Sequence, residues 1–502
     1  MLSVDKICDQ ALPKGMKLWT VAVTAIEQAK LQQTLAKLRA EAKVDDPLPV
    51  SPVVPTSTNA LTPDQQKVLQ RLWAGDSMFL TGGAGTGKTF LIRRFVEGRE
   101  GVLLFAPTGK AAVNIGGVTL HSFFKASIGI IDRSQYLKPD DNPAGKIGNV
   151  NADVLKAAKT IVIDEISTCR SDLFEYVTSI IKAAEHNWNK SYQIILTGDF
   201  FQLPPIVDKG KDAQLAWKRT QPNNPNGWAF KSPDWKFDSV SLHKVVRQND
   251  RDFSEALNRI RIGDNEGLVW INQHYQHGQP IGDYITVASK NKLVNDANEQ
   301  KLKALKKQGA PSKKYKLHKP TLTVDGINNR AENNDWKSVC EELLDVCIGA
   351  RVMCLCNHII RNNNDGATIN QNESYYNGET GTVTKLYANS VKVRLDRGIV
   401  VEIDRYKWYV YEYRIKNAQI EKVTIGEFEQ IPLRLAWAST VHKSQGMTYT
   451  TPVYIDTSAP FFAPGMAYVA LSRTTKIENL YISAPLKSSS LLTSQEVQDF
   501  YR

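Results

Sequence analysis

The sequence predicts an α/β protein whose parallel sheets are covered by helices on both faces. Between residues 61 and about 290, short runs rich in Val, Ile and Leu alternate with helical stretches, and examples of such runs are 101–105, 160–164 and 192–196. Strands of a parallel sheet are buried on both faces, so they appear as continuous apolar runs. The pattern resumes between 433 and 481, which predicts a second α/β domain.

Length and charge indicate several domains and a polyanionic partner. The chain has 502 residues, which is too long for one ordinary domain. Its 63 Lys and Arg outnumber 52 Asp and Glu, giving a formal net charge of +11. This excess of positive charge favours association with a polyanion such as nucleic acid.

The sequence carries no segment typical of a membrane span or an export signal. No run of 18 apolar residues occurs, and Asp5, Asp9 and Glu27 among the first thirty residues fit neither a signal peptide nor a transit peptide. Six cysteines in a chain of this length do not indicate a disulfide framework. We therefore expect a cytoplasmic protein, in a prokaryote or a phage-infected host rather than in an organelle.

Residues 1–60 are predicted to form an amphipathic helix followed by a proline-rich tether. Leu31, Leu35 and Leu38 recur at helical spacing, and the prolines of 46–55 exclude a helix there. The apolar stripe must be covered, either by the rest of the chain or by another protein, such as a replication or repair protein.

Residues 358–430 are predicted to form a small antiparallel barrel that interrupts the second α/β domain. Turns at 377–378 and 396–398 separate segments of alternating polarity, as in antiparallel hairpins. The preceding stretch, from about 300 to 340, is rich in Lys and Asn and weakly periodic, and we expect a solvated insertion.

Two side-chain clusters in this region have both a structural and a functional interpretation. Tyr409, Tyr411 and Tyr413 alternate along one predicted strand, so they share a face and either fill the barrel or stack on bases. The second cluster consists of Cys340, Cys347, Cys354, Cys356 and His358. Its spacing matches no standard zinc or iron–sulphur pattern, so we interpret these cysteines as buried apolar side chains.

The strongest chemical signal is a glycine-rich loop between a predicted strand at 77–80 and a predicted helix at 90–95. Its residues are Gly82, Gly83, Ala84, Gly85, Thr86, Gly87, Lys88 and Thr89. This is the order of a P-loop, in which backbone N–H groups hold the phosphates of ATP. Lys88 is then expected to contact the β- and γ-phosphates, and the Thr89 hydroxyl to bind Mg²⁺.

A second motif supplies the carboxylates that phosphoryl transfer needs. The apolar run 161–163 ends in Asp164 and Glu165. Asp164 is expected to hold Mg²⁺, while Glu165 orients and deprotonates the attacking water. ATP and Mg²⁺ are therefore the predicted cofactors.

Further motifs follow in order along the chain. They are Leu61-Thr-Pro-Asp-Gln65, Ala106-Pro-Thr-Gly-Lys-Ala-Ala112, Thr119-Leu-His-Ser-Phe123, Gly198-Asp-Phe-Phe-Gln-Leu-Pro-Pro205, Val246-Arg-Gln248, Val441-His-Lys-Ser-Gln-Gly446 and Tyr468-Val-Ala-Leu-Ser-Arg473. With the P-loop and the acidic pair, this series resembles the superfamily 1 DNA helicases of the branch containing RecD, Dda and the Pif-like enzymes. The resemblance covers about 61 to 485. It implies ATP-driven 5′-to-3′ translocation on single-stranded DNA and duplex unwinding in replication, recombination or repair.

The resemblance also implies roles at the ATP site. Gln65 would recognise adenine, and Gln202 would sense the γ-phosphate. Arg247 and Arg473 would be arginine fingers, which neutralise charge on the transferred phosphoryl group. The remaining implied ATP contacts are Gln445 and Gly446. From the residues alone, Gln65 serves equally as a helix cap, and each arginine equally as a surface ion-pair partner.

Six residues match family positions that contact the backbone of single-stranded DNA. They are Thr108, Lys110, Thr119, His121, Thr440 and His442. Hydroxyls and cations at these positions would meet phosphates and confer no sequence specificity. The two histidines alone fit buried core positions as well.

The resemblance implies two RecA-like P-loop motor domains with an SH3-like β-barrel inserted in the second. We expect the first domain at 61–240 and the second at 241–357 and 431–485, followed by a C-terminal tail at 486–502. A polar excursion at about 124–155 corresponds to a small duplex-splitting wedge in the resembled family, or to an ordinary surface loop. The expected substrates are single-stranded DNA and tailed or forked duplexes, and the motor is expected to be monomeric.

Three alternatives stay open on sequence alone. A nucleic-acid-stimulated switch that does not translocate shares every ATPase motif, and so does a motor that acts on RNA. A DNA-binding module without enzymatic activity is disfavoured because Lys88, Asp164 and Glu165 are all present.

Overall fold

The computed structural model describes residues 61–127, 129–132, 152–207, 210–245, 250–319, 321–324, 327–330, 339–358, 360, 373–416, 419–449 and 451–502, all within one compact unit. The predicted N-terminal helix and tether, the interior of the predicted wedge and Arg247 lie outside the described residues. None of the helices in the described part of the chain is both long and apolar enough to span a membrane.

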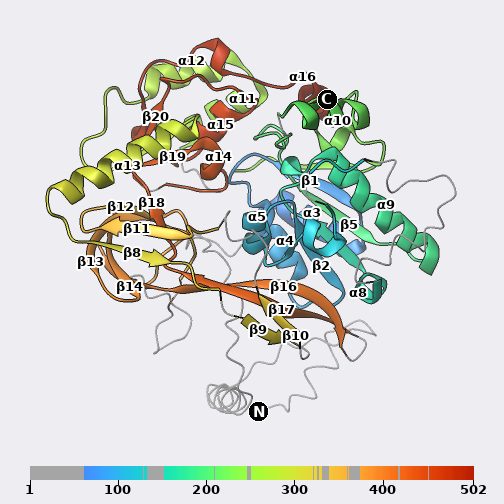
Figure 1. The fold of residues 1–502 in the computed structure, drawn as a ribbon. Coiled ribbons are helices and arrows are strands. Elements are labelled where there is room, and N and C mark those ends of the chain that lie inside the picture. The colour runs from blue at the N-terminus through green and yellow to red at the C-terminus, as the bar shows by residue number, and fades with distance from the viewer. Residues whose placement is uncertain are drawn as a thin grey trace, which may run out of the picture. The chain divides into compact units, whose positions relative to one another are not determined.

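A six-stranded parallel sheet forms the first domain (Figure 1). The strand order is β3-β2-β4-β5-β1-β6, and every neighbouring pair is parallel. The strands are β1 (Met78–Gly82), β2 (Val102–Ala106), β3 (Val118–Thr119), β4 (Thr160–Ile163), β5 (Gln193–Gly198) and β6 (Ser239–Leu242). The apolar runs at 101–105, 160–164 and 192–196 are thus confirmed as strands of a parallel sheet.

The side chains of this sheet alternate between two hydrophobic cores, one on each face. Helices cover both cores. On β1, Met78 and Leu80 face one core, while Phe79 faces the other. The first core is closed by α3 (Pro63–Ala74), α4 (Lys88–Val96) and the end of α5 (Gly109–Ile115). The second is closed by α6 (Leu120–Phe124), α8 (Ala152–Ala157) and α9 (Ser171–Trp188).

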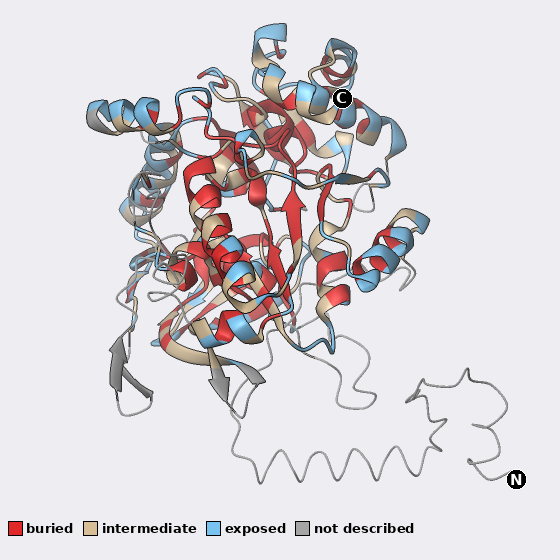
Figure 2. Cartoon of the chain, turned by 90° about the vertical axis from the view of Figure 1, so that its right-hand side faces the viewer, coloured by how far each residue is buried: buried red, intermediate tan, exposed pale blue. Residues whose placement is uncertain are grey.

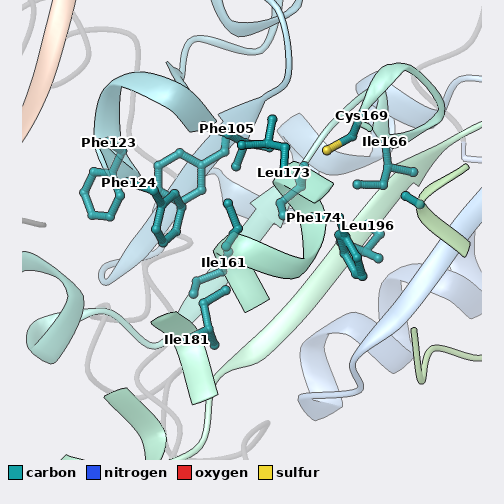
Figure 3. Close-up of a cluster of buried hydrophobic side chains, with 14 of the residues drawn as sticks. Phe105, Phe123, Phe124, Ile161, Ile166, Cys169, Leu173, Phe174, Ile181 and Leu196 are labelled. Carbon is teal, nitrogen blue, oxygen red and sulfur yellow. The ribbon is translucent and has the colours of Figure 1, made fainter. Parts of the chain in front are cut away.

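The second core is rich in aromatic and branched side chains, as the close-up in Figure 3 shows. Phe105 of β2 packs on Phe123 and Phe124 of α6, with ring centroids 4.8 and 5.3 Å apart. Ile161 of β4 and Leu173 of α9 belong to the same cluster. Burial of this kind contributes roughly 25 cal/mol per Å² of apolar surface, so it holds the ends of β1 and β4 firmly in place. Figure 2 shows the buried strands enclosed by helices whose outer faces are exposed.

A second parallel sheet, of order β19-β7-β20-β21, forms the second domain. Its strands are β7 (Ile285–Ala288), β19 (Ala438–Thr440), β20 (Val453–Asp456) and β21 (Leu480–Ile482). The helices of this domain are α11 (Arg251–Ile262), α12 (Asn265–His274), α13 (Asn291–Lys307), α14 (Val441–Ser444) and α15 (Met466–Leu471). The two predicted α/β domains are therefore both present.

An antiparallel region separates β7 from β19. Its five-stranded sheet has the order β15-β14-β13-β12-β18, and the strands are β12 (Arg351–Cys354), β13 (Thr380–Leu386), β14 (Ser390–Leu395), β15 (Val400–Asp404) and β18 (Leu433–Leu435). The pair β8 (Ser312–Lys316) and β11 (Leu343–Cys347) shares its core. A further hairpin joins β9 (Thr321–Val324) to β10 (Ile327–Arg330).

The antiparallel region extends beyond the predicted segment 358–430. Strands β12 and β18 lie outside that segment and pair with each other. The parallel pattern resumes at Ala438 rather than at 433, because Leu433–Leu435 is antiparallel to β12. The described part of 300–340 is mostly exposed, as expected of a solvated insertion, but it has regular structure: α13 continues to Lys307, and Tyr315 of β8 is buried.

Cys347, Cys354 and Cys356 are buried in the core of the antiparallel region. Their interpretation as apolar side chains is confirmed. Burial raises the pKa of each of these thiols, so they are protonated at neutral pH.

A long hairpin, β16 (Tyr406–Lys416) and β17 (Gln419–Gln430), leaves the antiparallel region and packs on the first domain, beside α8 (Figure 1). Tyr413 is buried in the first domain's aromatic core, and its hydroxyl accepts a hydrogen bond of 3.2 Å from the Leu104 N–H. Core packing is confirmed for Tyr413, but in the first domain rather than inside a barrel. The register of the hairpin shifts between Val410 and Tyr411, where β17 carries one extra residue.

The predicted C-terminal tail contains a helix that packs on the first domain. In α16 (Gln495–Tyr501), Phe500 stacks on Phe230 at 4.5 Å, and Val497 is buried in the aromatic core. The Tyr501 hydroxyl lies 2.7 Å from the hydroxyl of Thr81, at the end of β1. The segment predicted as a C-terminal tail thus contributes side chains to the core of the first domain.

Candidate ATP site and nucleic-acid contacts

The glycine-rich loop connects β1 to α4, as the sequence predicts. Gly85 and Gly87 have φ of 80° and 85°, a region that glycine adopts without strain. A Cβ at Gly82 would lie 2.6 Å from the Leu242 carbonyl oxygen, so the loop also requires glycine for close packing. No side chain caps the N-terminus of α4, which begins at Lys88. Its first N–H groups are therefore directed into the loop, where a phosphate would accept hydrogen bonds from them.

Lys88 lies within the loop, and its ammonium group donates to the carbonyls of Gly82 and Gly83 at 2.7 and 3.1 Å. Burial lowers its pKa, an effect that the nearby carboxylates of Asp199 and Glu165 oppose. The cation is thus held beside the loop that would bind phosphate, as its predicted role requires.

Thr89 and Asp164 offer a set of oxygen atoms suited to Mg²⁺. The Thr89 hydroxyl donates to Asp164 Oδ2 at 3.3 Å, and the other carboxylate oxygen accepts from the Glu165 N–H at 2.9 Å and from the Thr197 hydroxyl. Mg²⁺ prefers such oxygens and is commonly held by one or two carboxylates together with substrate phosphates. The predicted metal ligands therefore lie together at the start of α4.

Glu165 follows β4 in a left-handed backbone conformation, with φ 52° and ψ 41°. A residue other than glycine in this region is strained, and such strain occurs preferentially at functional sites. Burial, reinforced by the charge of Asp164, raises the pKa of Glu165 to about 7, while Lys88 opposes the rise. A carboxylate with a pKa near 7 is well suited to accept a proton at neutral pH.

The raised pKa of Glu165 predicts a pH dependence of hydrolysis. The base must be ionised, so we expect kcat/KM for ATP to fall about tenfold per pH unit below pH 7 and to level off above it. Initial rates at constant Mg²⁺ from pH 5.5 to 8.5 would test this, with the thermal midpoint recorded at each pH. A profile that is flat down to pH 5.5 in a folded protein would contradict the assignment.

Gln65 has two partners that its predicted role did not include. Its side-chain oxygen accepts from the Thr62 N–H at 3.0 Å, completing a capping box on α3, and its amide donates to the Thr86 carbonyl at 3.0 Å. The helix-cap interpretation is therefore confirmed. Recognition of adenine stays a prediction.

Residues of the second domain contact the loop and the end of β5. The Tyr468 hydroxyl accepts a hydrogen bond of 2.7 Å from the Ala84 N–H. The Gln445 amide lies 3.5 Å from the Gln202 side-chain oxygen, and Gly446 follows with a φ of 76°. These contacts bring together motifs that lie more than 200 residues apart in the chain, at the P-loop and at the loop after β5.

Arg473 is buried within the second domain. Its guanidinium donates to the carbonyls of Val469, Ser444 and Met447 at 2.6 to 2.9 Å. This arrangement stabilises the loop after α14. The finger role of Arg473 stays a prediction.

The three threonines predicted to contact DNA are N-caps of short helices. Thr108, Thr119 and Thr440 accept hydrogen bonds from the N–H groups of Ala111, Ser122 and Lys443, respectively. Because a cap hydroxyl keeps lone pairs and its own proton for further bonding, capping is compatible with a phosphate contact.

The three other predicted DNA contacts are partly buried. The Lys110 ammonium donates to the carbonyls of Lys443 and Gln445, across the domain boundary, and burial lowers its pKa to about 7. Burial also lowers the pKa values of His121 and His442, which favours their neutral forms. The contacts of these residues with DNA stay predictions.

Two residues at this site, Asp199 and Arg261, were not predicted from the sequence. Asp199 is fully buried and paired with Arg261 of α11, which lies in the second domain. The helical spacing indicates a buried position for Arg261. Phe253, Leu257 and Arg261 are spaced by four along one helix, which places the arginine on the helix's buried face.

A P-loop after β1, an acidic pair after β4 and a second parallel-sheet domain whose Tyr468 contacts the P-loop define a P-loop nucleoside triphosphatase built from two parallel-sheet domains. Comparison with known proteins shows which helicases this chain is similar to. Residues 60–267 match the model of the PIF1-like helicase family. The ATP-dependent DNA helicase Pif1 of Campylobacter jejuni is 29% identical over 469 residues, spanning 86% of this chain and 96% of the relative.

Solved structures agree with this match. A Bacteroides sp Pif1 in complex with ADP-AlF4 is similar with a TM-score of 0.71 and 28% identity, covering 88% of this chain and 97% of that one. Bacteroides Pif1 bound to single-stranded DNA gives a TM-score of 0.57 at 29% identity, covering 88% and 96%. The chain is therefore similar to Pif1 helicases over most of its length.

Proposed function

We propose that this chain is an ATP-dependent DNA helicase that translocates 5′-to-3′ on single-stranded DNA and unwinds duplexes in replication, recombination or repair. The observation that carries the proposal is the contact of both parallel-sheet domains at one P-loop, where Tyr468 meets Ala84 and Gln445 approaches Gln202. Because the site spans two domains, each hydrolysis event changes their relative position, which is what a motor requires.

Hydrolysis at this site would use groups from both domains. The P-loop N–H groups and Lys88 hold the phosphates of ATP, while Thr89 and Asp164 hold Mg²⁺, which neutralises phosphate charge when bound. Glu165 takes the proton of the attacking water. Gln202 senses the γ-phosphate, and Arg247 and Arg473 supply positive charge to the transferred phosphoryl group.

Single-stranded DNA is the proposed track, with tailed and forked duplexes as substrates. The net charge of +11 favours a polyanion, and one of the similar Pif1 structures is bound to single-stranded DNA. We further propose that the antiparallel region is an SH3-like module, that the motor acts as a monomer in the cytoplasm, and that residues 1–60 recruit a replication or repair protein.

A strand-displacement assay tests the proposal directly. The chain would be given ATP, Mg²⁺ and otherwise identical duplexes that carry a 5′ tail, a 3′ tail, an RNA tail or no tail. We expect ATP-dependent displacement from the 5′ DNA tail alone. Displacement only from the 3′ tail would overturn the polarity, stronger activity on the RNA tail would favour an RNA motor, and DNA-stimulated hydrolysis without displacement would indicate a switch.

A further inference from the structure

An ion pair joins the two motor domains beside the P-loop. The Arg261 guanidinium, at the end of α11, donates to both carboxylate oxygens of Asp199 with distances of 2.8 to 3.1 Å. Asp199 follows β5 of the first domain. Its side chain is 0% exposed and that of Arg261 is 14% exposed. A bidentate pair of this kind is charge-assisted and directional, and loss of either partner would leave an uncompensated buried charge.

Aromatic rings fix the position of the arginine. Its guanidinium carbon lies 4.6 Å from the ring centre of Phe201 and 5.8 Å from that of Tyr501, and the two rings stack at 4.8 Å. Tyr501 is held in turn by Thr81 at the end of β1. The planar cation therefore has one favoured position, between the carboxylate and the two rings.

The same carboxylate orients Gln202. Asp199 Oδ2 accepts from the Gln202 side-chain amide at 3.2 Å, and Oδ1 accepts from the Phe201 N–H at 3.2 Å. The Gln202 oxygen lies 3.5 Å from the amide of Gln445. A continuous series of contacts thus runs from Arg261 through Asp199 and Gln202 to Gln445, and both of its ends belong to the second domain.

Close packing around these residues restricts the movement of the side chains in this series of contacts. A Cβ at Gly465 of the second domain would lie 2.5 Å from the carbonyl oxygens of Phe201 and Gln202. A Cβ at Gly83 would lie 3.8 Å from the Arg261 side chain and 3.1 Å from the Tyr468 hydroxyl. The loop after β5 is therefore packed directly against the second domain.

We propose that Arg261 is a positioning residue for ATP hydrolysis: by binding Asp199 across the domain boundary, it holds Gln202 in the orientation that senses the γ-phosphate. This inference rests on the proposed function, because it assigns Arg261 to the same hydrolytic site. Hydrolysis is then fast only while the second domain contacts the loop after β5, which makes Arg261 part of the coupling between domain contact and chemistry.

The test compares Arg261→Gln with a matched control on the same helix. Arg259→Gln removes an arginine whose partners, Glu255, Asp264 and Glu266, all lie within the second domain. We expect Arg261→Gln to lower the DNA-stimulated kcat about 10- to 100-fold, the effect of losing a charge-assisted hydrogen bond, with KM for ATP within about threefold of the control. Arg261→Lys, which keeps the charge but loses the bidentate geometry, should lie between them.

The double variant Arg261→Gln/Asp199→Asn separates positioning from stability. Arg261→Gln alone leaves a buried unpaired carboxylate and should lower the thermal midpoint, whereas the double variant removes that charge and should recover it. We expect the kcat of the double variant to equal that of the slower of the two single variants, Arg261→Gln and Asp199→Asn, because Gln202 is still not oriented.

Three results would overturn the proposal. The first is a kcat of Arg261→Gln within twofold of that of Arg259→Gln. The second is recovery of kcat in the double variant. The third is a loss of kcat in the double variant equal to the product of the losses in Arg261→Gln and in Asp199→Asn measured alone. Absence of DNA-stimulated hydrolysis in the unsubstituted chain and in Arg259→Gln would instead contradict the proposed function, so the two failures are distinguishable.

Discussion

Replacing Lys88 by alanine is expected to reduce DNA-stimulated ATP hydrolysis by roughly 10³-fold, the loss associated with removing a main electrostatic contact to the reacting group. Its ammonium group lies within the loop, bonded to the carbonyls of Gly82 and Gly83. These carbonyls cannot replace it, because they would repel the γ-phosphate whose charge the lysine is placed to neutralise. The measurement is steady-state hydrolysis at saturating single-stranded DNA.

Affinity for single-stranded DNA should remain within a few-fold in this variant, since the predicted DNA contacts lie on other residues. Lys67→Ala, on the exposed face of α3, is a matched control and should hydrolyse ATP normally. Hydrolysis in Lys88→Ala close to that of Lys67→Ala would remove the P-loop assignment. If Lys88→Ala lost both DNA binding and ATP hydrolysis, the ATP site and the DNA contacts would not be separate.

Glu165→Gln is expected to lower kcat by roughly 10² to 10⁴-fold, the usual contribution of a general base. The amide has nearly the shape of the carboxylate and can keep the strained backbone, but it cannot accept the proton of water. ATP should therefore bind and remain unhydrolysed, which a filter-binding assay with labelled ATP would detect. The rise of rate through pH 7 should disappear as well, because the titrating group has been removed.

Glu97→Gln provides the control, since Glu97 is exposed and pairs only with Arg94 among its described partners. Turnover in Glu165→Gln within a few-fold of this control would mean that another group is the base. Asp164 is the nearest alternative, and its variant Asp164→Asn should then show the larger loss.

The parts of the site that sequence alone predicts are those built from consecutive residues. The P-loop and the pair Asp164 and Glu165 each follow a strand whose apolar run is visible in the sequence, so their position at the carboxyl edge of the sheet follows from local chemistry. Both α/β domains were predictable for the same reason, because burial on both faces leaves a continuous apolar pattern.

Contacts between distant segments were not predictable. Tyr413 looked like a barrel residue, yet its hairpin packs on β2 of the first domain, more than 300 positions away. The core that receives these side chains is formed by residues far away in the chain, and nothing in the composition of the strand indicates which core that is. The hydrogen bonds of Arg473 were not predictable either, because the backbone carbonyls that accept them are present in any sequence.

The docking of α16 on the first domain has a consequence for biosynthesis. Phe79, Phe200 and Phe230 lie within the first domain, but Phe500 completes their aromatic cluster more than 250 residues later in the chain. As the nascent chain leaves the ribosome, the first sheet can assemble while one aromatic face is still open to water, a condition that favours chaperone capture or aggregation. The ATP-binding domain therefore matures only after the second motor domain has been translated, so a nascent chain without α16 lacks the Tyr501 contact beside its P-loop.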